Sequence, residues 1–116
     1  DYFPTIASIT GIEAPVHDGI DLTQLLRENK KLPERPLFWH YPHYGNQGGS
    51  PGSAIRLGDW KLIEFFEDSR VELYNLKRDI GETKNLADQR PKIRNDLLTR
   101  LRTWRDEVGA RYPTPR

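Results

Sequence analysis

Residues 54–76, AIRLGDWKLIEFFEDSRVELYNL, decide the fold, because they read as three short strands joined by two turns. Gly58 and Asp59 fit a two-residue hairpin turn with glycine in its first central position. Residues 67–70, EDSR, fit a four-residue turn. The segment therefore predicts an antiparallel meander, with strand-like LFWHY at residues 37–41 as a further strand.

The two turns set a strand register, in which Ile55 lies opposite Leu62 and Phe66 lies opposite Val71. One face of the sheet is then mostly apolar and carries Ile55, Leu57, Trp60, Leu62, Phe66, Val71 and Leu73. The other face is also largely apolar and carries Ala54, Ile63, Phe65, Tyr74 and Leu76. An antiparallel sheet with one face in water alternates more cleanly than this. We therefore expect both faces to be covered.

The C-terminal segment supplies one cover. Pro91 suits the first turn of a helix, and apolar residues follow at steps of three and four: Ile93, Leu97, Leu101, Trp104 and Val108. This spacing predicts an amphipathic helix of about 18 residues and about 27 Å. One helix covers only one face, so the second face needs another partner.

The N-terminal third predicts two short helices. One ends near Gly11, and Asp21 can cap the second. A proline-punctuated connector precedes the strand at residue 37. The fold class is therefore α+β, with a small antiparallel sheet of about four strands packed by a long C-terminal helix. We divide the chain into residues 1–35, with the short helices and connector, and residues 36–116, with the sheet and long helix.

Composition excludes several classes of protein. Lysine and arginine total 18 against 17 acidic residues in 116, with no block of like charge, so nothing indicates a partner nucleic acid. No apolar run approaches the roughly 20 residues of a membrane span. The chain has no cysteine, which excludes disulfides and thiolate metal sites. It also has no methionine and opens on Asp1, so we expect a piece of a longer protein.

Three motifs in order carry a resemblance to a known family. They are ELYNLKRDIGETKNLA at residues 72–87, DYFPTIASITGI with DGIDLTQLL at residues 1–12 and 18–26, and AIRLGDWKLI at residues 54–63. Together they resemble the C-terminal portion of the sulfatases, the arylsulfatase-like, formylglycine-dependent hydrolases of the alkaline phosphatase superfamily. The resemblance covers almost the whole chain.

The resemblance implies a C-terminal subdomain docked on a missing N-terminal α/β catalytic domain of the same protein. The short N-terminal helices of this chain are then the end of that catalytic domain. It implies hydrolysis of sulfate esters or sulfamates in a sulfated small molecule or glycan, through a formylglycine residue and a bound calcium. A periplasmic, secreted or lysosomal location also follows. This chain has no Cys, no Ser-x-Pro-x-Arg core and no paired aspartates for the metal. We therefore expect it to carry neither cofactor nor nucleophile, and to be inactive alone.

The candidate site residues lie in residues 37–49, LFWHYPHYGNQGG. In sulfatases this part of the subdomain leans over the active-site mouth, which makes His40 and His43 candidates for substrate binding. The alternative is that His40 is a packed, hydrogen-bonded strand residue with Trp39 and Tyr41 in the core. A metal pair is disfavoured, because Pro42 and the aromatic neighbours indicate an extended segment whose alternate side chains diverge. A different class of function is a self-standing module that binds carbohydrate or protein through the aromatic residues.

Three groups of charged or polar residues have structural interpretations. Arg56 and Lys61 oppose each other in the first hairpin, and Glu72 on the same face favours a salt-bridge cluster. Residues Asp79, Glu82 and Asn85 lack the ligand pattern of a calcium loop, so we interpret them as turn and capping residues. The basic residues of the last helix, Lys92, Arg94, Arg100, Arg102 and Arg105, alternate with acidic ones and indicate a solvated face.

Overall fold

The computed structural model describes residues 1–46 and 48–114. Gln47, which belongs to the stretch 37–49 that holds the candidate site residues, lies outside the described residues. The chain divides into two compact units, Asp1–Glu34 and Arg35–Arg116. Among the described residues, no helix combines the length and apolar character that crossing a membrane requires.

The first unit contains α1 (Tyr2–Thr10) and α2 (Thr23–Glu28). Gly11 ends α1 in the left-handed conformation with φ of 71°, as the sequence predicted. The unit is tied together by side-chain oxygens that accept backbone N–H bonds. The Asp1 carboxylate accepts from Ile20 at 3.0 Å, and the Thr5 hydroxyl accepts from Leu22 at 2.9 Å.

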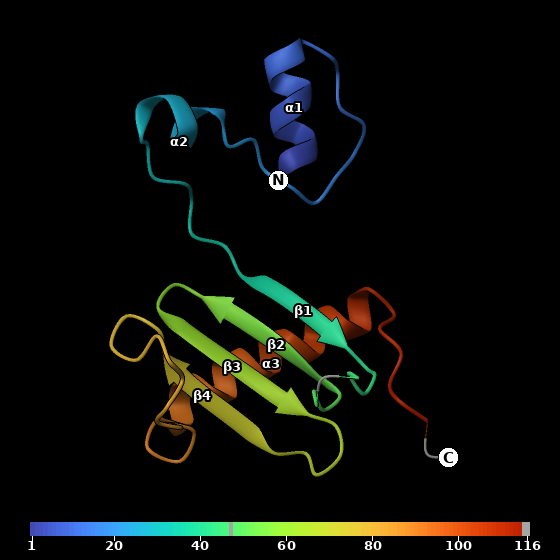
Figure 1. Ribbon diagram of the computed structural model, residues 1–116, viewed down its shortest axis with the longest axis vertical. Coiled ribbons are helices and arrows are strands. Elements are labelled where there is room, and N and C mark those ends of the chain that lie inside the picture. The colour runs from blue at the N-terminus through green and yellow to red at the C-terminus, as the bar shows by residue number, and fades with distance from the viewer. Residues whose placement is uncertain (47, 115–116) are drawn as a thin grey trace. The chain divides into compact units, whose positions relative to one another are not determined.

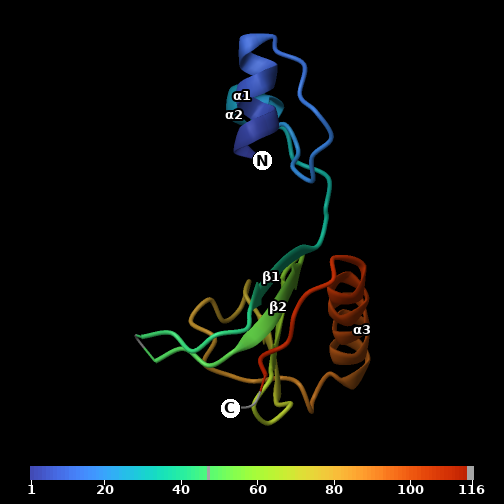
Figure 2. The same cartoon turned by 90° about the vertical axis from the view of Figure 1, so that its right-hand side faces the viewer.

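The second unit is a four-stranded antiparallel sheet with one long helix (Figure 1). The strands are β1 (Leu37–Tyr41), β2 (Gly52–Leu57), β3 (Trp60–Phe65) and β4 (Val71–Asn75), and they lie in sequence order. Helix α3 (Pro91–Glu107) runs along one face of this sheet (Figure 2). The predicted α+β class and architecture are confirmed.

The predicted register holds for one hairpin and is wrong by two residues for the other. Arg56 pairs with Lys61 as expected, but Glu64 pairs with Val71 where the sequence placed Phe66. The N–H of Phe66 instead donates to the carbonyl of Pro51 at 3.0 Å, so Phe66 leaves the β3–β4 ladder and joins the turn. A shift of two residues preserves the alternation of side chains. The residues that remain in the strands therefore lie on the faces that the sequence predicted.

The core lies between the sheet and α3. Its fully buried members, at 0 % exposure, are Ile55, Leu62, Leu73 and Leu101. The ring of Phe38 stacks on Trp104 with centroids 4.7 Å apart and an interplanar angle of 4°. Val108, which we expected in the buried stripe, is 56 % exposed because α3 ends one residue before it.

The sheet face away from α3 lacks a covering helix in the described second unit. Trp39 and Tyr41 on this face are 51 % and 55 % exposed, so the interpretation that placed them in the core is wrong. Lys61 forms an ion pair with Glu82 at 2.6 Å, while Glu72 contacts Arg70 at 3.1 Å. Glu82, rather than Glu72, therefore neutralises Lys61, and Glu72 pairs with Arg70, so the predicted pairing of Glu72 with Lys61 is wrong.

The loop after β4 is held by capping side chains, as predicted. The Asp79 carboxylate accepts the backbone N–H groups of Thr83 and Lys84 at 3.0 and 2.9 Å. The Asn85 side-chain oxygen accepts the N–H of Leu73 in β4 at 3.0 Å and that of Ala87 at 2.9 Å. Asn85 thereby anchors the loop to the edge of the sheet, where α3 then begins.

Candidate functional site

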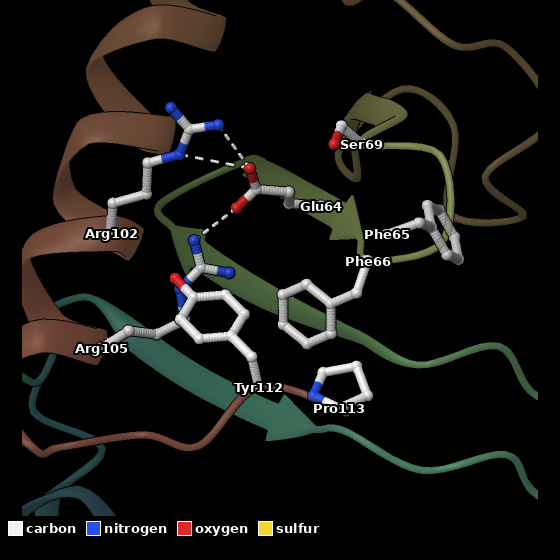
Figure 3. Close-up of a pocket in the computed structure, with 8 residues that line it drawn as sticks. All are labelled: Glu64, Phe65, Phe66, Ser69, Arg102, Arg105, Tyr112 and Pro113. Carbon is white, nitrogen blue, oxygen red and sulfur yellow. Dashed lines mark hydrogen bonds and ion pairs between the residues drawn. The ribbon is translucent and has the colours of Figure 1, made fainter. Parts of the chain in front are cut away.

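A carboxylate from the sheet meets two guanidinium groups from α3 at one end of the second unit (Figure 3). Glu64 is the third residue of β3 on the face toward α3, and only 5 % of it is exposed. Its Oε2 accepts from Arg105 Nη2 at 2.5 Å, and its Oε1 accepts from Arg102 Nε at 3.1 Å and Nη2 at 2.5 Å. Arg102 and Arg105 are three positions apart, so both reach the same carboxylate.

These contacts keep the carboxylate ionised. Burial by itself raises the pKa of Glu64, but the hydrogen bonds and charges of Arg102 and Arg105 outweigh it and leave the pKa below its ordinary value. The Arg105 guanidinium, in a residue 2 % exposed, also lies 5.3 Å from the ring centroid of Phe66 and 5.1 Å from that of Tyr112. Its Nε and Nη1 have no hydrogen-bond acceptor among the described residues. Arg105 is therefore held by one carboxylate and two aromatic faces.

The expectation that the basic residues of α3 form a solvated face is wrong for Arg105, which is 2 % exposed, whereas the Arg102 side chain stays 54 % exposed while it pairs with Glu64. The signal that could have identified the buried arginine lies in β3. Its alternation places Trp60, Leu62 and Glu64 on one face, so a carboxylate occupies a position where burial is expected. A buried carboxylate needs a cationic partner, and α3 is the element packed on that face.

An open hollow of about 1200 Å³ lies beside this cluster, and it is called the groove below. The loop after β1 contributes His43 and Tyr44, and the turn after β3 contributes Phe66 and Glu67. Arg111 and Tyr112 also line the groove. They belong to residues 110–114, which follow α3 and are called the tail below. A smaller hollow of about 330 Å³ over the Glu64 cluster shares Phe66 and Tyr112 with the groove.

The two candidate histidines lie in different surroundings. His40 is half-buried, and its Nδ1 lies 2.7 Å from Ser53 Oγ and its Nε2 lies 2.8 Å from the Arg111 carbonyl oxygen. These are contacts of a packed, hydrogen-bonded strand residue. His43 is exposed, lines the groove, and makes an edge-to-face contact with Tyr41 at 5.6 Å. The structure brings His43, rather than His40, to the surface of the groove.

The groove offers groups that suit a polar, anionic ligand with flat apolar faces. Tyr44 and Tyr112 are 68 % and 53 % exposed, and Arg111 is also exposed. The Tyr44 hydroxyl donates to Glu67 at 2.7 Å, and this hydrogen bond raises the pKa of Tyr44. Glu67 keeps its negative charge in this hydrogen bond, so Arg111 and the His43 ring are the groove groups that can meet an anion. Sequence reasoning missed Tyr44, Arg111 and Tyr112, because no local pattern indicates that the tail faces the loop.

The donors of the chain do not fit the cofactors that the sequence resemblance implied. Across residues 1–46 and 48–114, no three histidine, cysteine, aspartate or glutamate side chains are grouped as a metal site requires. The sequence contains no cysteine and no Ser-x-Pro-x-Arg core from which a formylglycine could form. No chemical step is therefore assigned to a metal or formylglycine in this chain.

Comparison with known proteins gives consistent similarities. The family described as N-sulphoglucosamine sulphohydrolase, C-terminal, matches residues 1–107. A sulfatase of Formosa agariphila is 36 % identical over 121 residues, which cover 90 % of this chain and 22 % of that protein. A delta 4,5-hexuronate-2-O-sulfatase of Bacteroides thetaiotaomicron is 34 % identical over 115 residues, with 96 % of this chain and 23 % of that protein covered.

Solved structures agree in fold. A protein in complex with its substrate, D-glucosamine-2-N,6-O-disulfate, superposes with a TM-score of 0.77 and 26 % identity over 95 % of this chain and 24 % of that chain. A 2-O GAG sulfatase superposes with a TM-score of 0.71 and 29 % identity, over 92 % of this chain and 24 % of that chain. The chain thus spans less than a quarter of the length of these relatives.

Proposed function

Since the chain belongs to the family of N-sulphoglucosamine sulphohydrolase C-terminal domains, we propose that it is the C-terminal part of a sulfatase that acts on sulfated glycans. In this proposal it contributes substrate contacts and not the nucleophile. The relatives support the substrate class, since one is a hexuronate-2-O-sulfatase and another structure holds a disulfated glucosamine. The whole enzyme would hydrolyse a sulfate ester or sulfamate.

The rest of the enzyme would supply the chemistry. In the proposal, an N-terminal catalytic domain carries the formylglycine and calcium, and residues 1–35 are its last segment, while residues 36–116 form the C-terminal subdomain. Exposed apolar residues in the first unit support a partner domain, since Phe3, Ile6, Ile9 and Leu26 are between 54 % and 68 % exposed. A location in the periplasm, outside the cell or in the lysosome belongs to the same proposal.

The groove is the observation that carries the substrate-contact role. It combines two exposed tyrosine rings, on which a sugar ring can stack, with Arg111 and His43, which can bind an anionic substituent. The guanidinium of Arg111 matches a sulfate or carboxylate with paired N–H donors. His43 can donate to a sugar hydroxyl as a neutral ring and can pair with an anion when it is protonated.

The test is the kinetics of His43→Ala in the full-length protein. On a sulfated disaccharide, we expect kcat/KM to fall about five- to 150-fold, the equivalent of roughly 1–3 kcal/mol for an unpaired polar partner. A small aryl sulfate lacks the remote groups, so its hydrolysis should change little. Lys77→Ala, an exposed charge on a residue that does not line the groove, is the matched control.

Two outcomes would contradict the proposal. The first is a full-length protein that releases no sulfate from any sulfated glycan while it binds glycan or protein through the exposed Trp39 and Tyr41. That result would favour the self-standing binding module. The second is an equal fall in kcat/KM on both substrates in His43→Ala, together with a lowered melting temperature. That result would mean that His43 stabilises the fold and does not bind substrate.

A further inference from the structure

The tail returns across the second unit after α3 ends. Gly109 adopts φ of +61°, a left-handed conformation that reverses the chain direction, and Ala110 N–H closes the turn on the Arg105 carbonyl at 2.9 Å. Figure 1 shows the tail descending beside β1, an edge strand of the sheet. The described part of the tail thus runs past the loop that carries His43.

Two contacts hold the tail in this position. The Arg111 carbonyl oxygen lies 2.8 Å from His40 Nε2. The Tyr112 ring packs edge-on against Phe66, with centroids 5.2 Å apart, and lies over the Arg105 guanidinium. Figure 3 shows Tyr112 between Arg105 and Phe66, over the end of the Glu64 cluster. The tail therefore carries one polar and one aromatic anchor on adjacent residues.

The chemistry of the contacts fixes the role of His40. A carbonyl oxygen can only accept a hydrogen bond, so His40 Nε2 is the donor to Arg111. In the neutral ring Nδ1 is then the acceptor, and the hydroxyl of Ser53, a residue 2 % exposed, is its donor at 2.7 Å. Both ring nitrogens are thus occupied inside the protein, and His40 has no free nitrogen for a ligand in this arrangement.

We propose that His40 is a positioning residue that fixes the tail as one wall of the groove, and that this wall selects glycans of more than one sugar ring. The selection step rests on the proposed function. Arg111 and Tyr112 are consecutive tail residues that offer a guanidinium and an exposed ring. Together they suit a sugar ring that carries a sulfate or carboxylate, next to the ring whose sulfate ester or sulfamate is hydrolysed.

The positioning role has a test that does not need activity. The bond between Arg111 and Tyr112 is a trypsin site, and its carbonyl is the one that His40 holds. In the full-length protein, His40→Leu should raise the rate of cleavage at this bond at least tenfold, because cleavage follows the opening of the tail. His40→Gln places an amide nitrogen near the position of Nε2 and should restore most of the protection.

His43→Ala is the matched control, because it removes a neighbouring histidine whose ring contacts Tyr41 and forms no hydrogen bond with the described part of the tail. It should leave the cleavage rate unchanged. Equal rates in the wild type and His40→Leu would overturn the positioning role, as would equal acceleration in His43→Ala. A thermal melt of each variant reveals global unfolding, and acceleration accompanied by unfolding of the whole unit would also count against a specific clamp.

The selection step is tested by kinetics on substrates of two sizes. His40→Leu should raise KM for a sulfated disaccharide at least fivefold with little change in kcat, and should leave a sulfated monosaccharide unaffected. If His40→Leu is cleaved faster by trypsin at the tail but has the same KM for the disaccharide as the wild type, the selection step is overturned. If the wild type hydrolyses no sulfated sugar, the proposed function and the selection step fail together, and the trypsin assay still decides the positioning role.

Discussion

Replacing Glu64 by Gln tests the buried charge cluster most directly. The substitution keeps the shape of the side chain but removes its charge from between Arg102 and Arg105. Arg102 has a side chain 54 % exposed and can turn to water, whereas the Arg105 side chain is 2 % exposed and cannot. Breaking a buried pair in this way costs about 3–5 kcal/mol, because one charge stays buried without a partner. We expect that loss in the free energy of unfolding.

A double variant distinguishes the net contribution of the Glu64–Arg105 ion pair to stability from the cost of leaving one of its charges buried without a partner. Glu64→Leu with Arg105→Met removes both charges and fills the space with apolar side chains, so it should recover most of the stability. Asp96→Asn is the matched control, since it breaks an arginine–carboxylate pair on α3 whose side chains are more than half exposed. Its expected cost is below about 1 kcal/mol.

The assay is urea unfolding of the 116-residue chain, followed by tryptophan fluorescence, over a range of pH. The pKa of Glu64 is lowered on folding from its ordinary value of 4.5. Its contribution is therefore fully present above that value and is lost as pH falls through the lower folded value. The gap between wild type and Glu64→Gln should narrow below about pH 4.5. A Glu64→Gln variant as stable as Asp96→Asn at neutral pH would refute this account of the cluster.

Three further results are expected. Trp104→Ala should lower the free energy of unfolding by about 3 kcal/mol, because it removes a half-buried ring stacked on Phe38, and chemical denaturation will measure it. Gly52→Ala should cost about 1–3 kcal/mol in the same assay, because its Cβ would lie 2.9 Å from the backbone oxygen of Glu64; an unchanged midpoint would contradict the tight approach. Burial is the largest cause, and the hydrogen bond to Glu72 the second, that raise the pKa of Tyr74 to about 12, so the free energy of unfolding should fall as pH rises from 10 towards 12. An absorbance titration of the tyrosines should show a last ionisation near pH 12 in the wild type, and that ionisation should be missing in Tyr74→Phe.

The sequence by itself determined the elements and their faces. Turn residues such as Gly58, apolar steps of three and four in α3, and period-two alternation in the strands are local signals. They survive a register error, because a slip of two residues leaves every side chain on the same face. The capping roles of Asp79 and Asn85 were also accessible, because short polar side chains in a turn satisfy nearby backbone groups.

Only the tertiary structure decided which distant residues meet. Glu64 and Arg105 are 41 positions apart, and His40 and the Arg111 carbonyl are 71 apart. The alternation of charge along α3 indicated solvent, yet the sheet buries Arg105, because the carboxylate of Glu64 offsets the cost of its desolvation. The groove likewise exists only because the tail turns back at Gly109. Local patterns report which side of an element faces the core, whereas a binding surface depends on where separate elements end in space.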